Sequence, residues 1–124
     1  MHPRTRKNIS TFGLNEKLIG MKNLVITEPL GYLDFLHLMS SSRLVLTDSG
    51  GIQEETTVLG VPCITLRNNT ERPVTVEQGT NIIVSTDRNK IIETANKVLK
   101  GAKFKSKAPK FWDGKAAQRI VKLF

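Results

Sequence analysis

Short apolar segments alternate with amphipathic segments along most of the chain. Four of the apolar segments are rich in β-branched residues and nearly continuous in hydrophobicity, and they cover 23–28, 43–48, 62–67 and 81–86. Such segments are typical of strands that are buried on both faces of a parallel sheet. We therefore expect a sheet of about four strands.

Segments with the helical spacing of apolar residues separate these strands. One of them has Asp87 at a position typical of an N-cap and Gly101 at a position typical of a helix stop. Strands and helices alternate at the spacing of βαβ units, so we expect an α/β fold with a parallel sheet and helices on both faces. The predicted helices cover 32–39, 51–59, 88–100 and 114–124.

The composition is that of a folded domain. The chain has 124 residues, which is enough for one domain, and 39% hydrophobic with 24% charged residues excludes a disordered or collagen-like chain. No apolar run approaches the roughly 20 residues of a membrane helix, and no apolar segment follows the basic start, so we expect neither membrane association nor a secretory signal. A single cysteine, Cys63, is compatible with a reducing compartment, and we expect a cytoplasmic protein.

The net charge of +8 arises at the two ends of the chain. Arg4, Arg6 and Lys7 precede the first acidic residue, and 100–110 holds five lysines and no acid. We interpret 101–124 as a lysine-rich connector followed by a helix. Since charge gathered at the ends is weak evidence for a nucleic-acid surface, we expect no nucleic-acid partner.

One strand-to-helix turn carries a candidate anion site. Ser49, Gly50 and Gly51 follow the strand at 43–48 and begin a helix. Ligands of open α/β sheets bind at the carboxyl ends of strands, and glycines at a helix start let an anion approach free N–H groups and the positive end of the helix dipole. Ser49 is the predicted N-cap, but Ile52 three residues later makes no capping box, which leaves the serine hydroxyl free for a ligand.

Glu55 lies one helical turn beyond Gly51. Its carboxylate is placed to accept hydrogen bonds from neighbouring sugar hydroxyls while phosphates occupy the helix tip. The spacing alone is also compatible with a tight turn and a solvated acidic face, because short glycine motifs are weak evidence.

Two further segments offer ligand contacts. Arg67 and Arg72, after the next predicted strand, can supply positive charge to a diphosphate, whereas an ion pair of Glu71 with either arginine is the structural alternative. Tyr32 and Phe35 either border a nucleobase or belong to the core.

Several of these segments, in the same order, resemble the C-terminal half of the non-hydrolysing UDP-N-acetylglucosamine 2-epimerases. The resemblance extends over nearly the whole chain, and a final segment is similar to the family's C-terminal end. The segments are 28–35 (EPLGYLDF), 47–55 (TDSGGIQEE), 59–62 (LGVP), 70–73 (TERP), 77–81 (EQGTN) and 111–117 (FWDGKAA).

The resemblance implies an incomplete Rossmann-like sheet, as in the C-terminal domain of a glycosyltransferase-B-like enzyme, over the single domain 1–124. It implies binding of UDP or a UDP-N-acetylhexosamine, with no cofactor and no metal. In the family, the matching residues hold the diphosphate (Ser49, Gly50, Gly51), the ribose (Glu55), the phosphate region (Arg72) and the uracil (Phe35 and the backbone of Leu30).

The resemblance also implies that the catalytic groups lie elsewhere. The family interconverts UDP-GlcNAc and UDP-ManNAc by removing the proton at C2 as UDP leaves and adding UDP back, which needs carboxylates near C2. In the family those carboxylates belong to an N-terminal domain that this chain does not contain. Neither His2 nor His37 matches the family's catalytic histidine. We expect no catalytic residue here and no epimerisation by the chain alone.

The absent region bears on the sheet and on the partners. If the family domain has the strand order 3-2-1-4-5-6, the segment at 23–27 must pair with 43–47, or its edge must meet another chain. We therefore expect a homo-oligomer or association with the N-terminal domain. The alternative functions are a non-catalytic regulatory or interaction module and half of a related glycosyltransferase.

Overall fold

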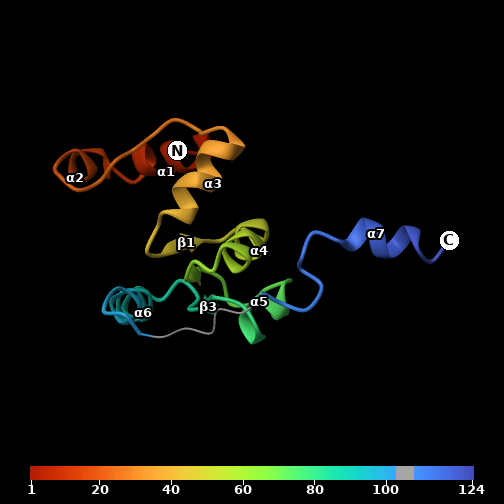
Figure 1. Cartoon of the computed structure of the whole chain (residues 1–124). Helices are drawn as coiled ribbons and strands as arrows, with labels where there is room; N and C mark the ends of the chain where they lie inside the picture. Colours follow the sequence, from red (N-terminus) through yellow and green to blue (C-terminus); the bar gives the residue numbers. More distant parts are fainter. Residues whose placement is uncertain (103–107) are drawn as a thin grey trace. The chain divides into compact units, whose positions relative to one another are not determined.

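The computed structural model describes residues 1–102 and 108–124 (Figure 1). The middle of the predicted lysine-rich connector, 103–107, lies outside the described residues. The chain divides into two compact units, Met1–Leu36 and His37–Phe124. No helix of the described residues is long and apolar enough to cross a membrane.

Helices and strands alternate through the second unit, as the sequence predicts. In chain order the elements are α1 (Pro3–Thr11), α2 (Asn15–Ile19), α3 (Tyr32–Ser40), β1 (Val45–Thr47), α4 (Gly50–Leu59), β2 (Cys63–Thr65), α5 (Pro73–Glu77), β3 (Asn81–Ile83), α6 (Arg88–Leu99) and α7 (Ala116–Val121).

The three strands form one parallel sheet in the order β1-β2-β3. Val45 lies beside Cys63, and Cys63 lies beside Asn81. The predicted α/β fold with a parallel sheet is confirmed. Because the strands are parallel, their carboxyl ends at Thr47, Thr65 and Ile83 share one edge of the sheet, where the turn into α4 begins.

The two faces of the sheet differ in chemistry, because successive side chains of a strand point to opposite faces. On one face Ile64 of β2 and Val84 after β3 pack with Val98 of α6, and these three side chains are buried. The opposite face carries Thr65 and Asn81, which are also buried. α6 therefore covers an apolar face, and the polar face lies toward α4.

The strand predicted at 23–28 is wrong. The segment forms no helix or strand, and among the described residues β1 pairs with β2 alone. The pairing with 43–47, one of the two expected alternatives, is therefore absent. Leu24, Val25 and Ile26 are exposed by 42%, 83% and 49%. A strand needs a hydrogen-bonded neighbour along its length, and the described residues provide none for this segment.

Three short helices were not predicted. α1 has Ile9 as its one large apolar residue, and α2 has only five residues, so neither is long or apolar enough to show a repeated apolar spacing. α1 begins where His2 acts as N-cap through its ring nitrogen and Pro3 supplies the first turn. α5 begins at Pro73, which supplies its first turn as Pro3 does in α1.

The predicted C-terminal helix is shorter than expected. α7 covers six residues and buries none of them. Asp113 accepts the N–H of Lys115 at 3.1 Å and pairs with Arg119, so one carboxylate holds the start of the helix. The same hydrogen bonds lower the pKa of Asp113 to about 2.

Candidate functional site

The turn between β1 and α4 leaves the start of the helix open. Ser49 is the N-cap, as predicted, with extended backbone angles and no hydrogen bond from its side chain to the helix. Its own N–H donates to Thr47 Oγ1 at 3.0 Å. Among the residues that the structure describes, the N–H groups of the first turn of α4 therefore receive no cap from Ser49, and the hydroxyl of Ser49 makes no hydrogen bond.

Gly50 and Gly51 face open space. A Cβ atom built on either residue would meet no atom within 4 Å, and neither residue has a positive φ. Neither packing nor backbone geometry therefore requires glycine here, although glycine in a helix costs up to about 1 kcal/mol relative to alanine. Gly79 contrasts with them, because its Cβ would lie 2.5 Å from Thr57 Oγ1. The space beside the two glycines at the start of α4 is therefore open.

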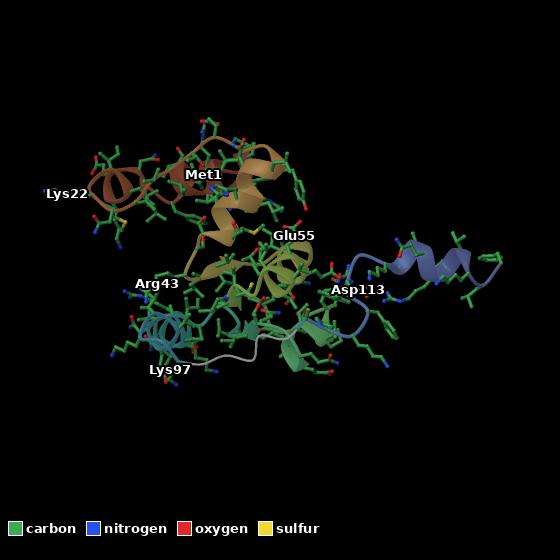
Figure 2. All side chains as sticks on the ribbon, in the orientation of Figure 1. Met1, Lys22, Arg43, Glu55, Lys97 and Asp113 are labelled. Atoms are coloured by element: carbon green, nitrogen blue, oxygen red, sulfur yellow. The ribbon has the colours of Figure 1, made fainter. Side chains whose placement is uncertain are left out.

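Glu55 extends from α4 (Figure 2) and is half-buried. It makes no ion pair with any residue of the described chain, whereas the preceding Glu54 does. The carboxylate of Glu55 is thus available to a ligand on the helix that carries the open N-terminus.

Arg72 is held against α4. Its Nε lies 3.0 Å from Glu54 Oε1, with both side chains about two-fifths exposed. The contact is an ion pair and not an aligned hydrogen bond. A partly exposed pair of this kind is weak, so an anion of higher charge can replace Glu54 as the partner of the guanidinium.

Beneath this surface lies a cluster of buried polar side chains. Gln53 is fully buried on α4, and its Oε1 accepts hydrogen bonds from Thr70 Oγ1 at 2.6 Å and Asn81 Nδ2 at 3.0 Å. Asn81 also donates to Thr75 Oγ1 at 3.1 Å and accepts from Thr65 Oγ1 at 2.5 Å. These bonds join α4, β2, β3 and α5 on the polar face of the sheet.

Sequence reasoning assigned no role to Gln53, Thr70 or Asn81, although all three lie in the motifs it singled out. A signal was present. Gln53, Thr56 and Thr57 occupy spacings of three and four residues, which put them on one face of α4, and all three are buried. A polar stripe on the inner face of a short helix between two buried strands indicates a polar interior.

The remaining predicted residues divide between the two units. Arg67 lies at the carboxyl end of β2 and pairs with Glu71 at 3.6 Å, which is the structural alternative foreseen for that loop. Phe35 is half-buried and Leu30 is 42% exposed, and both belong to the unit Met1–Leu36. Ser49, Gly50, Gly51, Glu55 and Arg72 come together around α4 in the other unit.

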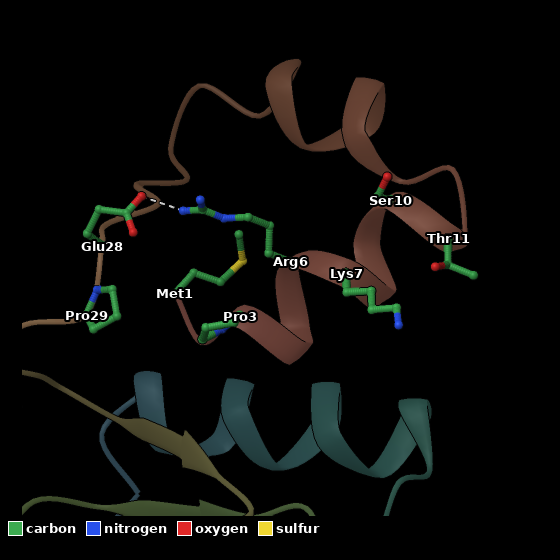
Figure 3. Close-up of a pocket in the computed structure, with 8 residues that line it drawn as sticks. All are labelled: Met1, Pro3, Arg6, Lys7, Ser10, Thr11, Glu28 and Pro29. Atoms are coloured by element: carbon green, nitrogen blue, oxygen red, sulfur yellow. Dashed lines mark hydrogen bonds and ion pairs between the residues drawn. The ribbon is translucent and has the colours of Figure 1, made fainter.

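A cavity of about 450 Å³ lies within the first unit (Figure 3). Arg6 and Glu28 pair in it, and their hydrogen bond lowers the pKa of Glu28. None of the predicted UDP-binding residues lines this cavity. Its lining residues are Met1, Pro3, Arg6, Lys7, Ser10, Thr11, Glu28 and Pro29.

Across residues 1–102 and 108–124 no three metal-ligating side chains gather into a group. Cys63 is fully buried in β2, and burial raises the pKa of its thiol, which disfavours the reactive thiolate.

The chain resembles known proteins along its whole length. The sequence pattern of the family described as UDP-N-acetylglucosamine 2-epimerase matches residues 1–124. The UDP-N-acetylglucosamine 2-epimerase of Methanocaldococcus jannaschii is 50% identical over 123 residues, which are 99% of this chain and 33% of that protein. This chain thus spans about a third of the length of the curated relatives it matches.

Structural comparison agrees. The crystal structure of the M. jannaschii UDP-GlcNAc 2-epimerase in complex with UDP-GlcNAc and UDP superposes with a TM-score of 0.84 at 50% identity, covering 98% of this chain and 33% of that one. A further relative, the UDP-2,3-diacetamido-2,3-dideoxy-D-glucuronate 2-epimerase of Pseudomonas aeruginosa, is 37% identical over 98% of this chain and 32% of its own length.

Proposed function

The chain belongs to the UDP-N-acetylglucosamine 2-epimerase family, and we propose that it supplies the UDP-binding part of such an enzyme. The observation that carries this proposal is the start of α4, where an uncapped N-terminus, two glycines and open space occur together. Such a helix end binds the negative charge of a phosphate through its N–H groups and its dipole.

The names of the relatives also support a role of this chain in UDP binding. Two relatives act, by name, on UDP-N-acetylglucosamine and on a UDP-linked diacetamido-glucuronate, so their substrates share UDP and differ in the sugar. Both align with almost all of this chain. A segment common to enzymes with different sugars is best suited to binding the common UDP.

We assign each predicted residue a role in that binding. Ser49, Gly50 and Gly51 hold the diphosphate at the start of α4, and Glu55 accepts hydrogen bonds from the ribose hydroxyls. Arg72 leaves Glu54 to contact a phosphate, and Phe35 with the backbone of Leu30 borders the uracil. Phe35 and Leu30 follow from the family resemblance, whereas the α4 residues also have the free groups that such contacts need.

We further propose that the chain by itself does not epimerise. The reaction needs an acid and a base within hydrogen-bond reach of C2. Helix α4 itself carries two carboxylates, Glu54 and Glu55. Glu54 is engaged by Arg72, and Glu55 is assigned to the ribose. Incubation with UDP-GlcNAc in D₂O tests this point: we expect no deuterium at C2 by NMR, and deuterium incorporation would contradict the proposal.

The exposed edge of the sheet suggests an association. β1 pairs on one side only within the described residues, and Leu46 in it is 46% exposed. An open strand edge favours pairing with another chain. We propose that a second copy or the remaining part of a longer enzyme covers it in the cytoplasm. Light scattering on the chain alone tests the first of these partners. A monomer mass would exclude the second copy and leave the remaining part of a longer enzyme as the partner.

Calorimetry with UDP tests the binding proposal directly. We expect UDP to bind, UMP to bind more weakly because it lacks one phosphate, and uridine to give no heat at the same concentration. Equal heats for UDP and uridine would contradict the role of α4, and the absence of any UDP heat would contradict the proposal as a whole.

A further inference from the structure

The cluster of buried polar side chains has no role in the UDP binding proposed above. Its hydrogen bonds extend through Thr70 to the backbone of Arg72. We propose that Gln53 and Thr70 form a hydrogen-bond relay that positions Arg72 for the UDP diphosphate. This inference rests on the proposed function. Gln53 Oε1 accepts from Thr70 Oγ1 at 2.6 Å, and Thr70 Oγ1 accepts the backbone N–H of Arg72 at 2.9 Å.

The hydroxyl of Thr70 is a donor to Gln53 and an acceptor from Arg72. A hydroxyl has one hydrogen to donate and two lone pairs. Since the hydrogen is given to Gln53, a lone pair is turned toward the N–H of Arg72. Gln53 thus sets the orientation of Thr70, and Thr70 sets the position of the backbone of Arg72.

The other side of Arg72 is also held. Its carbonyl oxygen accepts from Thr75 Oγ1 at 2.7 Å and from the N–H of Thr75 at 3.0 Å. Thr75 in turn accepts from Asn81, whose amide also donates to Gln53. Both polar groups of the arginine's backbone are therefore tied to one buried network.

Stability alone does not explain a glutamine at this position. Gln53 is fully buried, and its Nε2 finds no hydrogen-bond partner among the described residues. An unsatisfied buried donor opposes folding, and a leucine of similar size would avoid it, although the hydroxyl of Thr70 would then lose its acceptor. What glutamine supplies instead is orientation, because a buried hydrogen bond fixes the geometry of both its partners.

The benefit to the ligand is preorganisation. The guanidinium of Arg72 is shared with Glu54 and must change partner when a diphosphate binds. An arginine that starts from a fixed backbone loses less conformational freedom on binding than one on a loose loop. Gln53 and Thr70 are positioning residues in this scheme, since we propose that they act on the backbone of Arg72 and not on the ligand.

Hydrogen exchange in the ligand-free protein tests the relay without any nucleotide. Thr70→Val keeps the shape and removes the hydroxyl, while Thr70→Ser keeps the hydroxyl. We expect Thr70→Val and Gln53→Leu to speed exchange of the Arg72 amide by about tenfold or more, the equivalent of about 1.4 kcal/mol in opening free energy. We expect wild-type protection in Thr70→Ser. Unchanged protection in Thr70→Val would overturn the relay.

The matched control is Thr56→Val. Thr56 is a fully buried threonine of α4, and its hydroxyl donates to the Ile52 and Gln53 carbonyls of its own helix and not to the side chain of Gln53. The Thr56→Val variant should therefore leave the exchange rate of the Arg72 amide unchanged. Faster exchange in this variant would attribute the effect to general loosening of α4 and overturn the specific role of the relay.

A double-mutant cycle with UDP tests the consequence for binding. We expect Gln53→Leu to weaken UDP binding about tenfold in the wild-type background and to have no further effect in Arg72→Ala, because coupled residues are not additive. Equal weakening in both backgrounds would overturn action through Arg72. If the wild type bound no UDP, the proposed function would fail, and the exchange experiment would still decide the relay.

Discussion

Helices α4 and α6 follow strands of the same parallel sheet but differ in how their ends are capped. α6 has a side-chain cap, since Asp87 accepts the N–H groups of Asn89 at 2.9 Å and Lys90 at 3.1 Å. Its other end receives Arg43, whose guanidinium donates to the carbonyl of Leu99 at 2.6 Å. Both ends of α6 are satisfied by the chain itself, as expected for a helix whose function is to cover the core.

α4 has the opposite character. Ser49 makes no side-chain cap, glycines occupy the first turn, and the inner face carries Gln53 and two threonines where α6 carries an apolar stripe. Each of these features costs stability relative to the arrangement in α6. The comparison indicates that α6 is built for packing, and the open start of α4 agrees with our proposal that this helix end binds an anion.

Exchanging the N-cap residues of the two helices should have the largest effect on UDP binding. Ser49→Asp places a carboxylate where α6 has one, so it should cap α4, repel a diphosphate and weaken UDP binding by more than about 100-fold, the equivalent of more than about 2.7 kcal/mol. Calorimetry with UDP and urea unfolding measure the two effects. The reciprocal change Asp87→Ser in α6 is the control and should leave UDP binding intact. Retained UDP affinity in Ser49→Asp would remove the anion site from α4.

A carboxylate at the same place in both helices gives the next contrast. Glu55 and Glu93 are each the sixth residue of their helix, and Glu93 pairs with Lys97 at 2.7 Å. Glu55→Ala should weaken UDP binding about 10- to 100-fold, since hydrogen bonds to a charged group contribute about 1.5–3 kcal/mol. Glu93→Ala should not change the dissociation constant. A similar loss in both variants would point to a general effect of charge and not to a ribose contact.

Much of this contrast could be predicted from the sequence, and the exceptions have physical causes. The Asp87 cap, the Gly101 stop and the start of α4 at Ser49 follow from local rules, and all are confirmed: Gly101 has a φ of +86° just beyond α6. The strand at 23–28 failed because strand formation depends on a neighbour that the segment itself cannot reveal.

The polar interior was missed for a related reason. Gln53 and Asn81 are far apart in sequence and meet only because β3 lies beside β2 and α4 packs over both. The spacing of Gln53, Thr56 and Thr57 indicates a polar inner face of α4, but it does not identify the residues that bond to that face. The residue types of the candidate site were therefore predictable, while the network that supports them was not.

Removing the glycines should reveal the cost of the open helix end. Gly50→Ala and Gly51→Ala each place a methyl group in open space, so each should raise the free energy of unfolding by about 0.5–1 kcal/mol. The same methyl group lies where the diphosphate approaches, and UDP binding should weaken about tenfold. Urea unfolding and calorimetry on the same samples would show opposite signs. Variants that are less stable and bind UDP normally would mean that the glycines serve the fold.

The smallest expected effect lies on the outer face of α6. The hydrogen bond from Lys97 lowers the pKa of Glu93, so the ionised carboxylate is favoured in the folded state. The stabilisation is therefore present above about pH 4.3, the usual pKa of glutamate, and is lost as the pH falls through the lower folded value. In Lys97→Met the pKa of Glu93 should return toward its usual range in an NMR titration, with UDP binding unchanged. A change in UDP affinity on breaking this pair would show that α6 takes part in the site and would end the contrast with α4.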